Sequence, residues 1–353
     1  MSATIRERID APPVEAIPAI EAALEHGGSL IVQFAAAPYS SAVLTELNRL
    51  ADSFGEALEV RFFAHERAGF DCATLAKLPN VARLSVDCLT RVENLGHLAA
   101  LERLSALSLG VWELPDGAIL RAENLRRLSE LVLGETRRQV MDLSALSAFT
   151  RLTLLRLAGH TRNLRVLADL PALRSLSLKA VPRTVGLDFL GQHSGVRALT
   201  LRFGGRETLT DVELPELEEL EVVRVRGLRS LGDLGRFPQL RTLVIEDQPQ
   251  LEQIQLSAAN VALRQVRVIN CPRLRALAGL EAVPNLEVVR VVNTAVEPSA
   301  LRRDRLATSL RALAFGSGKV SLDRSIRRIS AHLGYEQPAE QPGILGIDWR
   351  RAP

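Results

Sequence analysis

The sequence contains few residues whose types and spacing would support catalysis. The segment FGSGKV (Phe315–Val320) resembles half of a phosphate-binding loop, in which glycines let backbone N–H groups approach a phosphate. It lacks the first glycine, and Val320 stands where a Ser or Thr would bind magnesium. We therefore expect no nucleotide site there.

Histidine and cysteine also give no site. The six histidines are scattered, and neither HExxH nor GxSxG occurs. A lone histidine just after a strand, such as His160, is more typical of a surface or turn residue than of a ligand. The cysteines Cys72, Cys88 and Cys271 form no CxxC motif, so neither a disulfide framework nor a zinc knuckle is predicted. We expect no catalytic residues, no metal and no cofactor.

Composition narrows the class of protein. Hydrophobic residues make up 47% and charged residues 24%, which is close to the average for globular domains. The net charge of +3 is too small to indicate nucleic-acid binding. No apolar run approaches the ~20 residues that span a bilayer, and the N-terminus has no uninterrupted apolar segment. We expect a cytoplasmic protein, although export by a route without such a signal stays open.

One six-residue pattern recurs along the chain. It is LxxLxL, with Val, Ile or Phe also allowed, and its copies follow one another every 21 to 24 residues. The alternation of its last positions predicts a short strand with two side chains pointing inward. One unit cannot bury its own apolar face, so stacked units must share a core. The eleven copies begin at Val81, Leu104, Leu128, Leu152, Leu173, Val196, Leu217, Leu240, Leu263, Leu286 and Leu310.

This pattern resembles the leucine-rich-repeat family, with the short period of bacterial internalin-like and phosphatase-regulator-like repeats. The best unit is LRQVRVINCPRLRALAGLEAVPN (Leu263–Asn285), in which Asn270 is assigned to the family's asparagine position. Most other units lack that asparagine. The resemblance covers about residues 56–318 and implies an α/β solenoid: a leucine-rich-repeat arc with a parallel concave β-sheet. The return segments are only ~15 residues long, so we expect them to be 3₁₀ turns and extended pieces more than full helices.

The ends of a solenoid need caps. Residues 1–80 are interpreted as an α/β N-terminal cap that merges into the sheet, with helices over Val14–Gly27 and Ser40–Phe54 and strands over Ser29–Phe34 and Leu58–Phe63. Residues 81–320 hold about 11 repeats. Residues 321–353 are expected to form a C-terminal cap, with a helix over Leu322–Gly334 followed by a tail. The apolar residues of that tail are Ile344, Ile347 and Trp349.

The strand residues between the buried leucines are the candidate binding residues, because in this family they face the concave side. Their signs alternate along the chain, and apolar residues expected to be exposed, such as Val223, Val244 and Ile269, lie beside arginines. Solvation of a sheet does not require apolar residues there, which favours docking of another protein. The predicted partner-binding residues are Arg156, Lys179, Arg202, Glu219, Glu221, Val223, Glu246, Arg267, Ile269, Arg290 and Val292.

The family resemblance implies protein binding and supplies no partner. We expect a non-catalytic bacterial protein, monomeric when unbound, that binds another protein on its concave face as an enzyme inhibitor or toxin-neutralising immunity protein. One alternative is a secreted effector that docks on a host protein. Another is an enzyme with a polar cleft in residues 1–80. A third alternative, nucleic-acid binding through the arginines, is disfavoured by the acidic residues at 216–221. If the protein has no partner on this face, the charged side chains of the strands serve only to solvate the sheet and prevent aggregation.

Overall fold

The computed structural model describes most of the chain. The described residues are 6–64, 69–114, 117–137, 140–192, 195–297, 305–316, 323–324, 328 and 334–336. They divide into two compact units, residues 1–173 and residues 174–353. The C-terminal helix and tail predicted for residues 321–353 fall almost entirely outside the described residues, as does most of FGSGKV.

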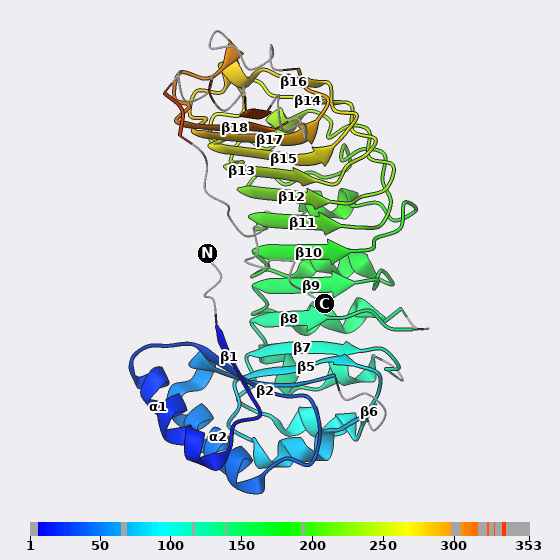
Figure 1. Ribbon diagram of the computed structural model, residues 1–353. Coiled ribbons are helices and arrows are strands. Elements are labelled where there is room, and N and C mark those ends of the chain that lie inside the picture. Colours follow the sequence, from blue (N-terminus) through cyan, green and yellow to red (C-terminus); the bar gives the residue numbers. More distant parts are fainter. Residues whose placement is uncertain are drawn as a thin grey trace. The chain divides into compact units, whose positions relative to one another are not determined.

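The first unit is built on a parallel sheet with the strand order β1-β2-β3-β5-β7-β8-β9 (Figure 1). A second pair of short strands, β4 and β6, lies beside it. The strands are β1 (Glu7–Asp10), β2 (Leu30–Phe34), β3 (Leu58–Phe63), β4 (Phe70–Asp71), β5 (Arg83–Leu89), β6 (Val92–Glu93), β7 (Ala106–Val111), β8 (Glu130–Leu133) and β9 (Leu154–Ala158).

Two helices connect the first three strands. They are α1 (Ile17–Glu25) and α2 (Ser41–Phe54), and they pack against each other. The Ser40 hydroxyl caps α2 by accepting a hydrogen bond from the Val43 N–H (3.4 Å), and the helix ends at Gly55, whose φ of 51° suits glycine. The two predicted helices and the strands β2 and β3 are confirmed. Strand β1, which pairs in parallel with β2, was not predicted.

The second unit repeats the same plan, and its described residues include no helix as long as α1 or α2 (Figure 1). Its sheet has the order β10-β11-β12-β13-β15-β17-β18, and every pairing is parallel. Strands β14 and β16 form a separate pair. The strands are β10 (Ser175–Lys179), β11 (Ala198–Arg202), β12 (Glu219–Val223), β13 (Thr242–Glu246), β14 (Gln253–Gln255), β15 (Gln265–Cys271), β16 (Ala276–Ala278), β17 (Val288–Thr294) and β18 (Ala312–Gly316).

All eleven predicted repeat strands are present, from β5 to β18. In each, the two inward positions are apolar and buried, as with Leu220 and Val222 of β12, which are both 0% exposed. The return segments contain short 3₁₀ helices such as Leu143–Ala148 and Leu164–Asp169. A segment of about 15 residues has room for such turns and little more, which is why the sequence favoured them.

The eighth residue of most units turns the chain away from the strand in the left-handed conformation. The φ angles are 55° at Asp247, Asn270 and Asn293, and 51° at Arg224. Asparagine adopts this conformation more readily than other non-glycine residues. The assignment of Asn270 to the buried asparagine position is therefore wrong. Asn270 is a partly exposed corner residue, whose Nδ2 donates to the Asp247 carboxylate at 2.9 Å.

The ninth residue fills the buried position instead. It is His160 in one unit (2% exposed), Gln248 in another (0%) and Cys271 in the next (0%). The Gln248 amide donates to the Val222 carbonyl of the preceding unit at 3.3 Å. His160 accepts a hydrogen bond from the Met141 N–H at Nδ1 (3.1 Å), and its Nε2 lies 2.7 Å from the Gly134 carbonyl. Different polar side chains thus tie successive units together.

Acidification should expose this role of His160. Burial lowers the pKa of His160 below 6.5, because the charged imidazolium loses hydration inside the protein. The neutral imidazole is also the form whose Nδ1 can accept the hydrogen bond from the Met141 N–H. The unfolded chain then binds the proton more readily than the folded one. The contribution of neutral His160 to the free energy of unfolding is therefore fully present above the unfolded pKa of about 6.5, and it is lost as pH falls below that value. Urea unfolding should show a lower free energy of unfolding at pH 5.5 than at pH 7.5, and this difference should be smaller in His160→Asn than in the natural chain. The exposed His97→Asn is the control and should leave the pH dependence unchanged.

Candidate functional site

The outer face of the second sheet carries the candidate site. We use "outer face" for the strand side chains that alternate with the core-facing ones. Parallel registration aligns them in columns across the seven strands. The middle column is Ser177, Thr200, Glu221, Val244, Arg267, Arg290 and Ala314, and the next is Lys179, Arg202, Val223, Glu246, Ile269, Val292 and Gly316.

Ten of the eleven predicted binding residues lie on this outer face. The strands bring together side chains that are 21 to 24 residues apart in sequence, such as Arg267 and Arg290, which are direct register partners. Glu219 comes from the first column of β12, where burial raises the pKa of its carboxyl. Arg156 is the exception, because it lies on β9 in the first unit.

Several of these side chains are buried, which contradicts the expected exposure of the apolar ones. Val223 is 3%, Val244 5% and Ile269 5% exposed. Glu221 (1%) and Glu246 (2%) are buried with them. Alternation along a strand is enough to tell which way a side chain points, but it does not reveal what packs over it. We call Thr200, Glu221, Val223, Val244, Glu246 and Ile269 the buried patch of the outer face.

An ion pair joins Glu221 of this patch to the neighbouring, mostly buried Arg202. The Arg202 guanidinium donates through Nη2 to both carboxylate oxygens of Glu221, at 3.2 and 3.3 Å. The Thr200 hydroxyl donates to the same carboxylate at 3.3 Å. The side chains of Arg202 and Glu221 are only 12% and 1% exposed, so water screens their attraction weakly.

Beside the patch, the face is partly exposed and cationic. Arg267 and Arg290 stand next to each other in the middle column, with Val292 flanking them in the neighbouring one, and all three are partly exposed. Two adjacent cations with an apolar neighbour form a surface suited to an acidic partner with an apolar anchor. The arrangement of Arg267, Arg290 and Val292 could therefore recognise both the charge and the shape of a partner's surface.

A second polar cluster, on the outer face of the first unit, was missed by the sequence analysis. Arg61 donates to Asp87 at 2.8 Å and to the Gln33 side chain at 3.0 Å, and Gln33 donates to Asp10 at 2.6 Å. The signal was present as alternating polar residues in β1, β2, β3 and β5, but β1 and β2 lie before residue 56, where the resemblance begins, so the four strands were not aligned with one another. Each of these polar groups has a partner within the cluster, which is typical of a structural network.

The thiols of the chain are poor nucleophiles. Burial raises the pKa of Cys72 and of Cys271 to about 12, so both remain protonated near neutral pH. Burial also raises the pKa of Cys88. Within the described part of the chain, no group of histidine, cysteine and carboxylate side chains is arranged to hold a metal ion.

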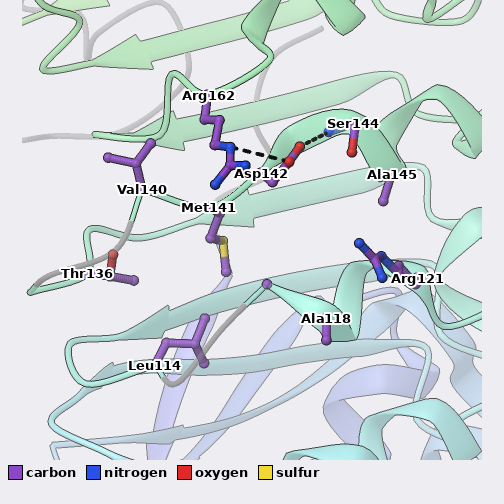
Figure 2. A pocket seen from close by; sticks show the side chains of 11 residues that line it. Leu114, Ala118, Arg121, Thr136, Val140, Met141, Asp142, Ser144, Ala145 and Arg162 are labelled. Carbon is purple, nitrogen blue, oxygen red and sulfur yellow. Dashed lines mark hydrogen bonds and ion pairs between the residues drawn. The ribbon is translucent and has the colours of Figure 1, made fainter.

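A shallow pocket of about 300 Å³ opens in the first unit (Figure 2). It is lined by Leu114, Val140, Met141 and small residues, with Arg121 and Arg162 among its polar groups. Figure 2 shows Arg162 directed at Asp142, and their closest atoms are 3.4 Å apart. Hydrogen bonds from Asn163 and from Ser144 hold the pKa of Asp142 at about 2. This carboxylate stays ionised near neutral pH, so it is unsuited to proton transfer there.

Comparison with solved structures identifies the fold. An internalin (InlF) from Listeria monocytogenes is similar with a TM-score of 0.52 and 15% identity over 88% of this chain and 86% of that one. The Toll–Spatzle complex of Drosophila is similar with a TM-score of 0.52 and 16% identity over 91% of this chain and 48% of that one. The chain therefore has the α/β solenoid fold of leucine-rich-repeat proteins, as the resemblance of its repeats implied.

No family model and no curated protein sequence matches the chain. The similarity of this chain to known proteins therefore rests on the fold. Among the described residues, no helix has the length and apolar character that crossing a bilayer requires.

Proposed function

We propose that this protein binds another protein through the outer face of its second unit and carries out no catalysis of its own. The observation that carries the proposal is the composition of that face. Ordered strands display the adjacent Arg267 and Arg290 next to Val292 and the buried Arg202–Glu221 pair. A preformed face of this kind needs little ordering when a partner binds, so modest contacts can add up.

The proposed partner carries acidic residues around an apolar anchor. Such complementarity suits an inhibitor or a toxin-neutralising immunity protein, which must recognise one target through a fixed surface. An effector that docks on a host protein would use the same face. The two differ in where the partner is found: in the source cells for an inhibitor or immunity protein, and in a host for an effector.

Charge reversal at Arg267 and Arg290 should show whether these arginines bind a partner or only solvate the sheet. In Arg267→Glu/Arg290→Glu, an acidic partner would meet like charge, so its affinity should fall by about tenfold or more. The matched control is Arg273→Glu/Arg275→Glu, which makes the same charge change at exposed positions between β15 and β16.

The measurement is affinity capture from lysate of the source cells and of candidate hosts, followed by titration of the captured protein against each variant. Circular dichroism checks that both variants fold. A partner that binds both variants as well as it binds the natural chain would contradict the proposal. Retention that depends steeply on salt and is removed by nuclease would indicate nucleic-acid binding instead.

A further inference from the structure

Phe203 is an exposed aromatic residue at a backbone position that does not suit it. It follows β11 as the corner residue of its repeat, with a φ of 58°, and it is 39% exposed. A bulky side chain is uncommon in this left-handed region, which costs less for asparagine, the residue at the corners formed by Asn270 and Asn293. The packing of the repeat therefore does not explain a phenylalanine here, and an outlier of this kind points to a role in function.

Backbone hydrogen bonds hold this corner in place. The Phe203 N–H donates to the Val223 carbonyl at 2.9 Å, and the Gly204 carbonyl accepts from the Arg226 N–H at 3.2 Å. Gly204, with a φ of 72°, lies so close to the next loop that an added Cβ would stand 2.3 Å from the Val181 carbonyl oxygen. The ring is thus attached to an ordered turn, so a partner that binds it pays little to order the backbone.

Cations lie beside the ring. The Lys179 Nζ is 5.6 Å and the Arg224 guanidinium carbon 5.7 Å from the ring centroid. Arg224 also donates to Asp247 at 2.7 Å, yet its side chain stays 55% exposed. Within residues 179–183, 203–207 and 224–226 and at position 247, the charged side chains that are not buried are Lys179, Arg183, Glu207, Arg224, Arg226 and Asp247. The four cations and two carboxylates leave an excess of two positive charges around the ring.

One exposed ring among cations fits a protein segment better than a nucleic acid. Proteins that bind single strands stack successive bases on several aromatic side chains. Among the described residues of the second unit, the exposed large apolar side chains are Phe203 and Val261, so no second exposed ring stands beside the first. An apolar side chain that packs on the ring, with carboxylates on either side of it, would match both the aromatic surface and the excess of positive charge.

The corner lies close enough to Arg267 for one partner to contact both. Thr200 of β11 is in register with Arg267 of β15 across three strand spacings, which amount to about 14 Å. Phe203 lies three residues beyond Thr200, about 10 Å further along the strand direction, so the separation is about 17 Å. A standard interface of about 800 Å² per partner is about 30 Å across and includes both.

We propose that the Phe203 corner, meaning Phe203 with Lys179 and Arg224, binds a segment of the partner protein in which carboxylates flank one apolar side chain. This inference rests on the proposed function for the partner's being a protein. It adds a second contact, at the C-terminal edge of the strands, to the one at Arg267 and Arg290.

A synthetic peptide tests this contact in the full chain. The probe is a fluorescently labelled peptide in which glutamates flank a central tryptophan, titrated at low salt and followed by fluorescence anisotropy. Phe203→Asn should weaken its binding by about tenfold or more, while the urea unfolding midpoint stays the same or rises, because asparagine suits a φ of 58°. Lys179→Gln/Arg224→Gln should weaken binding several-fold. Val261→Asn removes an apolar side chain that is 50% exposed and should change neither quantity.

A double-mutant cycle shows whether the ring and the apolar side chain touch. A peptide with alanine in place of the tryptophan should bind the natural chain about tenfold more weakly, and Phe203→Asn should reduce its binding little further. Losses that simply add, or a tryptophan peptide that binds Phe203→Asn as well as the natural chain, would overturn the proposal. So would a tryptophan peptide that does not bind, or an oligothymidine that displaces it and depends on Phe203. No captured partner enters these measurements, so their failure is separate from failure of the proposed function.

Discussion

Replacing Arg202 by alanine should lower the free energy of unfolding by about 3–5 kcal/mol, because it leaves the Glu221 carboxylate buried without its guanidinium. Glu221 is 1% exposed and cannot recover its hydration without local opening. Urea unfolding followed by circular dichroism measures the change. Arg229→Ala, at an exposed position, is the control and should cost less than about 0.5 kcal/mol.

The double variant Arg202→Met/Glu221→Leu separates the two contributions to this loss. Removing both charges also removes the desolvation penalty, so most of the stability should return. If Arg202→Ala costs no more than Arg229→Ala, the pair is not a buried interaction and our description of the face is wrong.

The second large effect is expected in the aromatic cluster of the first unit. Phe62 is 0% exposed and stacks between Phe34 and Phe70, with ring centroids at 5.5 and 4.4 Å. The Tyr39 ring meets it edge-on at 5.2 Å. Phe62→Ala should cost about 3–5 kcal/mol, because it leaves a cavity as well as removing these contacts.

Phe203→Ala is the matched control, since Phe203 is 39% exposed. Thermal unfolding should show a large fall in Tm for Phe62→Ala and a small one for the control. Equal shifts would mean that the cluster does not stabilise the first unit. A melt of the Phe62 variant with two transitions would show that the units unfold separately.

Much of the fold could be predicted from the sequence, because the positions of the leucines in each repeat correspond to the side chains that pack in the core. Each LxxLxL copy marks a strand whose inner leucines must be buried, and all eleven strands follow. The helix α2 could also be predicted, because serine is a typical residue before the first turn of a helix and glycine a typical residue after its last turn, as Ser40 and Gly55 are here. These features depend on local pattern alone.

Other features could not be predicted, because they depend on what lies next to a residue in space. The buried ninth position accepts His160, Gln248 or Cys271, so no single residue type marks it. Strand β1 is short, and three of its four residues are charged, so only its pairing with β2 makes it a strand. The burial of Val223 was missed for the same reason: alternation gives the direction of a side chain and not its cover.

The shared location of the candidate residues could be predicted from the sequence, but their burial could not, and partner binding by them stays a prediction. The sequence placed charges and apolar groups on one face, and ten of the eleven residues are indeed on the outer face of the second unit. It did not separate the Arg202–Glu221 pair, which is buried, from Arg267 and Arg290, which are partly exposed. That difference decides which substitutions should alter stability and which should alter binding.

The most direct test of the central claim is site-specific photocrosslinking in the source cells. A benzophenone amino acid at Val292, on the outer face, should crosslink to one defined protein, while the same group at exposed Val261 should not. The account predicts that this adduct is lost in the Arg267→Glu/Arg290→Glu background. An adduct with a defined protein at Val261 and none at Val292 would contradict it.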